Sequence, residues 1–127
     1  MSDSASTTSV AERLQLKGAR RLAALNGPLP VSDAIAGELP RVPAREADVV
    51  VLFVSDRAEL DLLLPDAVRA VRPDAILWLA YPKLTSSLKG DLNRDLIHQA
   101  CLAMGLKTVA QIAIDRDWSA MRLKPLA

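Results

Sequence analysis

The densest group of side chains that could do chemistry lies in residues 82–94, where a loop leads into a predicted helix. Ammonium and guanidinium groups, hydroxyls and the free N–H groups of a helix start all bind oxyanions. The loop lacks the glycine spacing of an ATPase phosphate loop, so the pattern predicts a small-anion site of another kind. A solvated surface loop with ordinary helix capping is the alternative. The candidate ligand-binding residues are Lys83, Thr85, Ser86, Ser87, Lys89 and Arg94.

A second interpretation of the same loop is that Ser86 or Ser87 is a nucleophile paired with Lys83, which lies near both in the chain. Any serine-rich loop beside a lysine would suggest such a pair, and no second feature supports it. His98, the only histidine, lies off the apolar stripe of its predicted helix, and a surface position explains it. We therefore assign no catalytic residue.

Charged residues also gather at the start of that predicted helix. Asp91, Arg94 and Asp95 fall within one helical turn. Acids in a first turn complement the helix dipole, which accounts for both aspartates. Arg94 is free in this interpretation to bind a neighbouring carboxylate or a ligand.

Other candidates lie outside this loop. Asn26 and Gly27 form a turn after a weak first strand, and Ser55 and Asp56 follow the next predicted strand. These two turns are secondary candidates for the ligand site. Trp118 and Arg122, also secondary candidates, point to the same side of the last predicted strand. They could form a ligand platform, and a core or subunit contact for Trp118 is the alternative.

Strand and helix patterns alternate through the second half of the chain. Two runs are apolar on both faces, as in strands covered by helices, and two segments carry apolar residues at helical spacing. The predicted elements are strands over 20–25, 47–54, 75–81, 107–114 and 118–123, and helices over 57–72 and 91–104. This order predicts one Rossmann-like α/β domain: a mostly parallel open sheet, a C-terminal antiparallel hairpin and helices on both faces.

Helix details follow from the same patterns. Asp56 with Glu59 can cap the first of these helices, and Pro65 predicts a kink or a restart within it. The predicted buried stripe of the second helix is Leu92, Leu96, Ile97, Ala100, Cys101 and Met104.

The first third of the chain is less regular. Residues 1–8 are polar and predict a disordered tail, which leaves 9–127 for the domain. Ser9 and Glu12 fit a capping box and predict a short helix to about residue 16. Residues 28–45 contain four prolines and leave room for one helix over 31–39.

Composition excludes several classes of protein. The net charge is +1 with acids and bases interspersed, so we expect no nucleic-acid binding. One cysteine and one histidine cannot form an intrachain disulfide or a structural zinc site, and we predict no metal site. No signal peptide and no membrane span is visible, so we expect a soluble cytoplasmic protein.

The residues with the most distinctive pattern are Arg13–Gly18, Ala47–Val54, Leu77–Lys83, Asp91–Asp95 and Asp117–Arg122. Through them the chain resembles a family of small bacterial proteins known only as a domain of unknown function, over roughly residues 9–125. Its second half also resembles the C-terminal half of the Rossmann-like S-adenosylmethionine methyltransferase fold. The resemblance implies a fold and no established activity.

A methyltransferase of that fold needs a glycine-rich turn after its first strand and an acid at the end of its second. Here the turn has one glycine, Gly27, and Pro28 after it lacks an N–H. No clear second strand with a terminal acid follows, and Glu38 or Glu46 would be a forced choice. We therefore expect no cofactor, and S-adenosylmethionine in particular is not expected to bind.

The sequence favours a non-catalytic domain that binds a protein partner or a small anionic ligand. Catalysis needs convergent titratable groups, and the sequence supplies few. An enzyme that uses residues 83–94, a degenerate methyltransferase or another transferase, is one alternative. A homodimeric assembly module that buries the spare apolar surface of a short sheet is the other.

Overall fold

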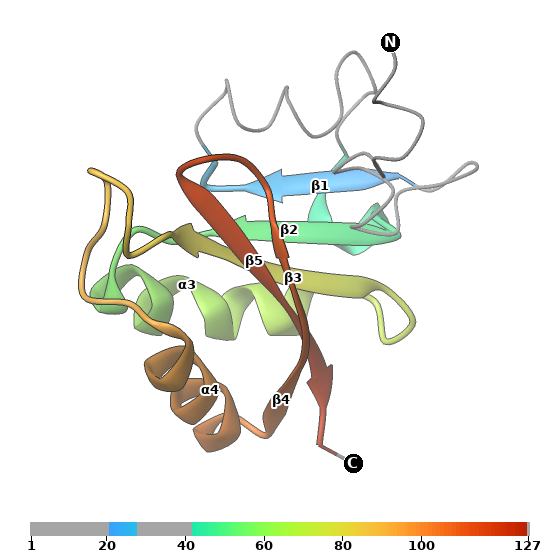
Figure 1. Ribbon diagram of the computed structural model, residues 1–127. Helices are drawn as coiled ribbons and strands as arrows, with labels where there is room; N and C mark the ends of the chain where they lie inside the picture. The colour runs from blue at the N-terminus through green and yellow to red at the C-terminus, as the bar shows by residue number, and fades with distance from the viewer. Residues whose placement is uncertain (1–20, 28–41, 127) are drawn as a thin grey trace, which may run out of the picture.

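The computed structural model describes residues 21–27 and 42–126. The predicted tail, the helix predicted after Ser9 and the helix predicted over 31–39 lie outside the described residues. Figure 1 shows the elements, which are β1 (Leu22–Leu25), the 3-10 helix η2 (Ala44–Glu46), β2 (Val49–Phe53), α3 (Arg57–Ala70), β3 (Ile76–Pro82), α4 (Arg94–Ala103), β4 (Leu106–Ala113) and β5 (Trp118–Pro125).

The strands of the described residues form one sheet in the order β1-β2-β3-β5-β4. β1, β2 and β3 pair in parallel, with Val51 opposite both Ala24 and Trp78. β5 runs antiparallel to β3 on one side and to β4 on the other. The parallel pairing of the central strands and the C-terminal hairpin are confirmed. The sheet is mixed rather than mostly parallel, because the hairpin adds two antiparallel pairings to two parallel ones.

The pairing of β4 with β5 contains an irregularity that the sequence did not predict. Thr108 lies opposite Leu123, and Ala110 lies opposite Arg122, so the register shifts at Val109. An extra residue on one strand of an antiparallel pair is a β-bulge, which bends the strand and reverses the faces of the residues after it.

Both α helices lie on one face of the sheet (Figure 1). Leu60 and Leu64 of α3 and Ile97 and Cys101 of α4 belong to one buried cluster with Leu79 of β3. All five side chains are fully buried. Burying each large aliphatic side chain stabilises the fold by about 1.5–3 kcal/mol, so this cluster holds both helices in place.

The other face of the sheet carries a second buried cluster, which includes Val51, Phe53, Trp78 and Trp118. The rings of Phe53 and Trp118 meet edge to face, with centroids 5.3 Å apart. No α helix of residues 42–126 lies on this face. Helices were expected on both faces of the sheet, and within the described residues they cover one.

The helix at residues 57–70 is continuous through Pro65, so it does not restart there, and the predicted alternative of a kink stays a prediction. Proline removes the N–H that would bond to the carbonyl of Asp61. Because Asp61 is exposed, water can bind that carbonyl, and the helix tolerates the loss.

The second helix begins at Arg94 rather than at Asp91. The side chain of Asn93 accepts a 2.9 Å hydrogen bond from the N–H of Leu96, which makes Asn93 the N-cap. Asp91 therefore lies ahead of the helix and not in its first turn. Ile97 is fully buried, whereas Leu96, predicted for the same stripe, is half-buried.

None of the helices in the described ranges is both long and apolar enough to cross a membrane.

Candidate functional site

A cavity of about 450 Å³ opens at the end of β3, between the loop after this strand and the start of α4. We call it the α4 cavity. The loop contributes Lys83, Leu84 and Thr85 to its lining, and α4 and the strands β4 and β5 contribute the rest. The cavity lies at the carboxyl end of the parallel strands, the edge at which open α/β sheets bind ligands.

The loop is fixed to the turn between β4 and β5 through Asp117. The carbonyl of Asp117 accepts a 2.7 Å hydrogen bond from the N–H of Lys83. Its carboxylate accepts one of 2.8 Å from the hydroxyl of Ser86, which itself accepts from the N–H of Leu88. Ser86 is buried and Asp117 is half-buried, so these bonds are partly shielded from water and set the shape of the loop.

The far end of the loop packs against the start of α3. The carboxylate of Asp91 accepts a 2.8 Å hydrogen bond from the N–H of Arg57. A Cβ on Gly90 would lie 2.5 Å from the carbonyl oxygen of Ser55, so only glycine fits there. The loop is thus attached at both ends, and the cavity wall that it forms is built into the fold.

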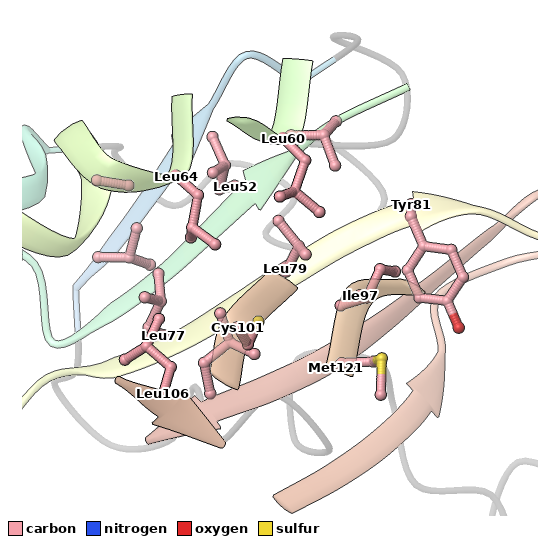
Figure 2. Close-up of a cluster of buried hydrophobic side chains, with 14 of the residues drawn as sticks. Leu52, Leu60, Leu64, Leu77, Leu79, Tyr81, Ile97, Cys101, Leu106 and Met121 are labelled. Atoms are coloured by element: carbon pink, nitrogen blue, oxygen red, sulfur yellow. The ribbon is translucent and has the colours of Figure 1, made fainter. Parts of the chain in front are cut away.

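A hydrogen-bonded chain crosses the floor of the cavity from α4 to β3. Gln111 of β4 accepts a 3.3 Å bond from Arg94 and donates one of 3.1 Å to the hydroxyl of Tyr81. Tyr81 is 3% exposed, and Figure 2 shows its hydroxyl turned away from the leucines of the core. Burial raises the pKa of Tyr81 above its ordinary 10.0, against the smaller opposing effects of Arg94 and Gln111. The phenol is therefore protonated at neutral pH.

Ser119 of β5 adds a second hydroxyl to the floor. It lies directly opposite Tyr81 in the antiparallel β3–β5 pair and lines the cavity. Its residue is 6% exposed, yet no described residue forms a hydrogen bond with its side chain. Its oxygen is not among the fully buried polar atoms of the described residues that lack a partner, so it is accessible to water or to a molecule in the cavity.

The first turn of α4 brings charges of both signs to the cavity. Arg94 and Asp95 line it, and Lys83 stands on the loop side. Within residues 42–126, none of these three side chains forms an ion pair. Two positive groups against one negative leave the lining with a net charge of +1.

The structure brings three of the six predicted ligand-binding residues into the cavity lining. These are Lys83, Thr85 and Arg94. Ser86 is turned to Asp117 and shapes the loop, while Ser87 and Lys89 are exposed and are not part of the lining.

The secondary candidate Asn26 has a positive φ of 59°, and its side chain donates a 2.9 Å bond to the carbonyl of Phe53. A Cβ on its neighbour Gly27 would lie 2.6 Å from the ring of Phe53. This turn therefore serves the packing of β1 on β2. It borders a separate apolar hollow of about 280 Å³ beside Leu25 and Leu52.

Asp56 caps α3, and Ser55 precedes it. Asp56 accepts a 2.9 Å bond from the N–H of Glu59, whose carboxylate accepts one of 2.6 Å from the N–H of Ser55. The predicted capping by Asp56 and Glu59 is confirmed. Together with Asp91, these carboxylates already occupy the start of α3.

Trp118 and Arg122 lie on the same face of the sheet, as predicted, and outside the α4 cavity. Trp118 is 4% exposed and contacts Phe53, which makes it a core residue. Arg122 lies opposite Trp78, and its Nε atom is buried with no hydrogen-bond partner among the described residues.

Three residues of the cavity floor were missed by sequence reasoning. Tyr81 had a usable signal, because a buried aromatic with a polar tip ends an otherwise apolar strand. The sequence also carried a signal for Ser119, since this residue shares the inward face of its strand with Met121. The sequence carried no signal for Gln111, because the bulge in β4 decides which way its side chain points.

Other reactive groups of the described residues lie outside the cavity. No group of three His, Cys, Asp or Glu residues in residues 21–27 and 42–126 is suited to hold a metal ion. Burial raises the pKa of Cys101 to about 11, so it remains a thiol. His98 is exposed and hydrogen-bonded to Thr108 at 3.0 Å.

Comparison with known proteins places the chain in a family. No curated protein matches it. It is similar to the solved structure of a ribosomal protein L11 methylase from Lactobacillus delbrueckii subsp. bulgaricus, with 15% identity and a TM-score of 0.49 over 89% of this chain and 61% of that one. It is also similar to LepI in complex with SAM, with 13% identity and a TM-score of 0.43 over 91% of this chain and 39% of that one.

The chain spans less than two thirds of either protein's length, and likeness at this level transfers neither an activity nor a ligand. The model of one family, described as "Protein of unknown function (DUF3052)", matches residues 30–126. The predicted resemblance to a domain of unknown function is thereby confirmed, and this chain belongs to the DUF3052 family.

Proposed function

We propose that this protein is a non-catalytic domain that binds a small anionic ligand in the α4 cavity. The observation that carries the proposal is the lining, where Lys83 and Arg94 lack ion-pair partners among the described residues beside the unpartnered hydroxyl of Ser119. Ionised donors form short and strong hydrogen bonds with oxyanions. Arg94 adds geometric selectivity, because a guanidinium can bind two oxygens at once.

The backbone of α4 supports the same ligand. Asn93 caps only the N–H of Leu96, and the N–H groups of Arg94 and Asp95 have no acceptor among the described residues. Free N–H groups at a helix start carry partial positive charge and attract an anion. They reinforce the side chains, which supply the full charges.

Two observations favour binding over catalysis. Neither the hydroxyl of Ser119 nor that of Thr85 is hydrogen-bonded to a base among the described residues, so no nucleophile is activated. The phenol of Tyr81 has a raised pKa and does not act as a base at neutral pH. The groups that line the cavity are equipped to donate hydrogen bonds.

The proposal is tested by calorimetric titration of the folded chain with inorganic phosphate and sulfate. Replacing Arg94→Ala or Lys83→Ala removes a charged hydrogen bond and is expected to weaken binding by about tenfold or more. Arg69→Ala and Lys124→Ala are the matched controls, because both side chains are exposed and outside the cavity lining. Both control variants are expected to bind phosphate and sulfate with the affinity of the unchanged protein.

The site of binding is read independently from the single tyrosine of the chain. Carbon-13 labelling of tyrosine gives one ring signal, and it belongs to Tyr81 on the cavity floor. Addition of phosphate is expected to shift this signal with the same midpoint as the calorimetric titration. Binding that leaves the signal unmoved and is equal in Arg94→Ala would place the ligand elsewhere, and no binding of either anion would refute the proposal.

A further inference from the structure

We infer that the ligand of the α4 cavity is a small hydroxylated molecule with a terminal oxyanion, whose oxyanion accepts a hydrogen bond from Tyr81 and whose hydroxyls donate to Asp95. This inference rests on the proposed function and specifies its ligand.

The orientation of Gln111 decides where the hydrogen of Tyr81 points. A guanidinium has only donors, so the amide oxygen of Gln111 must face Arg94, 3.3 Å away. The amide nitrogen then faces Tyr81 and donates to its oxygen over 3.1 Å. The phenol oxygen is used as an acceptor, and its own hydrogen has no acceptor among the described residues.

The cavity is therefore rich in hydrogen-bond donors, which come from the buried Tyr81 and Ser119 and from the exposed Arg94. The phenol hydrogen of Tyr81, the hydroxyl of Ser119 and the remaining N–H groups of Arg94 all lack acceptors among the described residues. An oxyanion offers several acceptor lone pairs and no donors, so it satisfies these groups together. The raised pKa of Tyr81 keeps its hydrogen in place as a donor.

The open cavity has room for more than an oxyanion. A phosphate group takes the space of roughly two to four water molecules, at about 30 Å³ each. The cavity measures about 450 Å³, which leaves room for an organic part. Leu84 lines the cavity on the loop side and offers an apolar surface to the carbon atoms of that part.

Asp95 defines the chemistry of the organic part. Its carboxylate lines the cavity next to Arg94 and has no hydrogen-bond or ion-pair partner among the described residues. A carboxylate repels a bare anion and only accepts hydrogen bonds. Beside an anion site, it matches a ligand that carries hydroxyl donors next to its charge. A first-turn acid also complements the helix dipole, and that role is independent of any ligand.

The test compares four probes by calorimetric titration of the folded chain. Inorganic phosphate carries the oxyanion only, ribose the hydroxyls only, and ribose 5-phosphate both, while gluconate replaces the phosphate by a carboxylate. Ribose 5-phosphate is expected to bind about tenfold more tightly than phosphate, and ribose not measurably. The order of ribose 5-phosphate and gluconate identifies which oxyanion the cavity prefers.

Two substitutions assign the contacts, and a third is their control. Asp95→Asn is expected to bring the affinity for ribose 5-phosphate down to that for phosphate while leaving phosphate binding equal or stronger. Asp66→Asn, on the exposed side of α3, is the matched control and is expected to change neither. Tyr81→Phe keeps the ring and removes the hydroxyl, so it is expected to weaken both probes by the same factor.

The outcomes separate this inference from the proposed function. If phosphate and ribose 5-phosphate bind equally and Asp95→Asn affects neither, the hydroxylated ligand is wrong while the anion site stands. If Tyr81→Phe leaves both affinities unchanged, the role of Tyr81 is wrong. If neither phosphate, ribose 5-phosphate nor gluconate binds, the proposed function and this inference fall together.

Discussion

The hydroxyl of Ser86 donates a 2.8 Å hydrogen bond to the carboxylate of Asp117, 31 residues further along the chain. This contact joins the loop after β3 to the turn between β4 and β5. It places the cavity wall at Lys83 and Thr85, since these residues precede Ser86 in the same loop. A hydroxyl that the sequence offered as a ligand group thus shapes the loop that carries the other ligand groups.

Ser86→Ala is expected to destabilise the protein by about 1.5–3 kcal/mol, because it removes a partly buried hydrogen bond to a charged group. Urea unfolding at neutral pH measures the change. The neighbouring Ser87 is exposed, and Ser87→Ala is expected to stay within about 0.5 kcal/mol of the unchanged protein. Equal effects of the two substitutions would show that the contact with Asp117 does not hold the loop.

Ile97→Ala is expected to cost about 2–5 kcal/mol, through lost burial and the cavity left behind. Ile97 is fully buried between α4 and the sheet, whereas Leu102 on the same helix is 42% exposed. Leu102→Ala is therefore expected to cost far less. Unfolding midpoints that rank the two variants in the opposite order would show that the buried face of α4 is misassigned.

Gly27→Ala is expected to destabilise the protein by about 1–3 kcal/mol, because a methyl group there collides with Phe53. The ring cannot retreat easily, since it is fully buried against Trp118. Phe53→Leu in the same chain makes room, so the double variant is expected to lose less than the sum of the two single losses. A strictly additive double-mutant cycle would argue against this contact.

The tyrosine titration has a defined sign. The positive charge of Arg94 lowers the pKa of Tyr81 against the larger effect of burial. Arg94→Ala is therefore expected to raise this pKa further and delay the appearance of phenolate absorbance in an alkaline titration. Arg69→Ala is the control, and an unchanged or lowered pKa in Arg94→Ala would contradict the packing of Arg94 over Gln111.

Acid stability depends on Asp48, which lies just before β2. Its carboxylate accepts hydrogen bonds from the N–H of Arg21 and from the side chain of Arg72, and these bonds lower its pKa below the ordinary 3.8. A carboxyl with a lowered folded-state pKa stabilises the fold above its unfolded pKa, and this contribution is lost as the pH falls through the folded value.

Asp48→Asn is accordingly expected to reduce the free energy of unfolding at neutral pH. The difference from the unchanged protein should shrink as the pH falls below 3.8. Urea unfolding at a series of acidic pH values measures it, with Asp66→Asn as the surface control. A difference that is constant across this range would mean that the carboxylate charge of Asp48 does not stabilise the fold.

Local sequence was sufficient for the central elements. Residues 49–53 are apolar on both faces, the cap Asp56 marks the start of α3, and the apolar stripes mark both helices. The position of β5 between β3 and β4 could not be obtained this way. Both hairpin strands are apolar enough to pair with β3, and the choice depends on how Met121 and Leu123 pack in the cluster shared with both helices.

The candidate site was predicted in its location and only partly in its residues. Composition identifies a loop rich in lysine and hydroxyl groups, because these groups are close in the chain. It cannot identify Gln111 and Ser119, which reach Tyr81 only through strand register. Nor can it tell that Ser86 is already bonded within the protein, since Asp117 is distant in sequence.

The bulge at Val109 has a consequence for self-association. β4 is an outer strand of the described sheet, and an outer strand can template the addition of another chain through its unpaired backbone groups. The bulge interrupts that row near its middle, and Lys107 adds an exposed charge to it. A second copy therefore cannot extend the sheet past β4 as a continuous ladder, which protects this edge of the sheet from pairing with another chain and directs any dimer to a different surface.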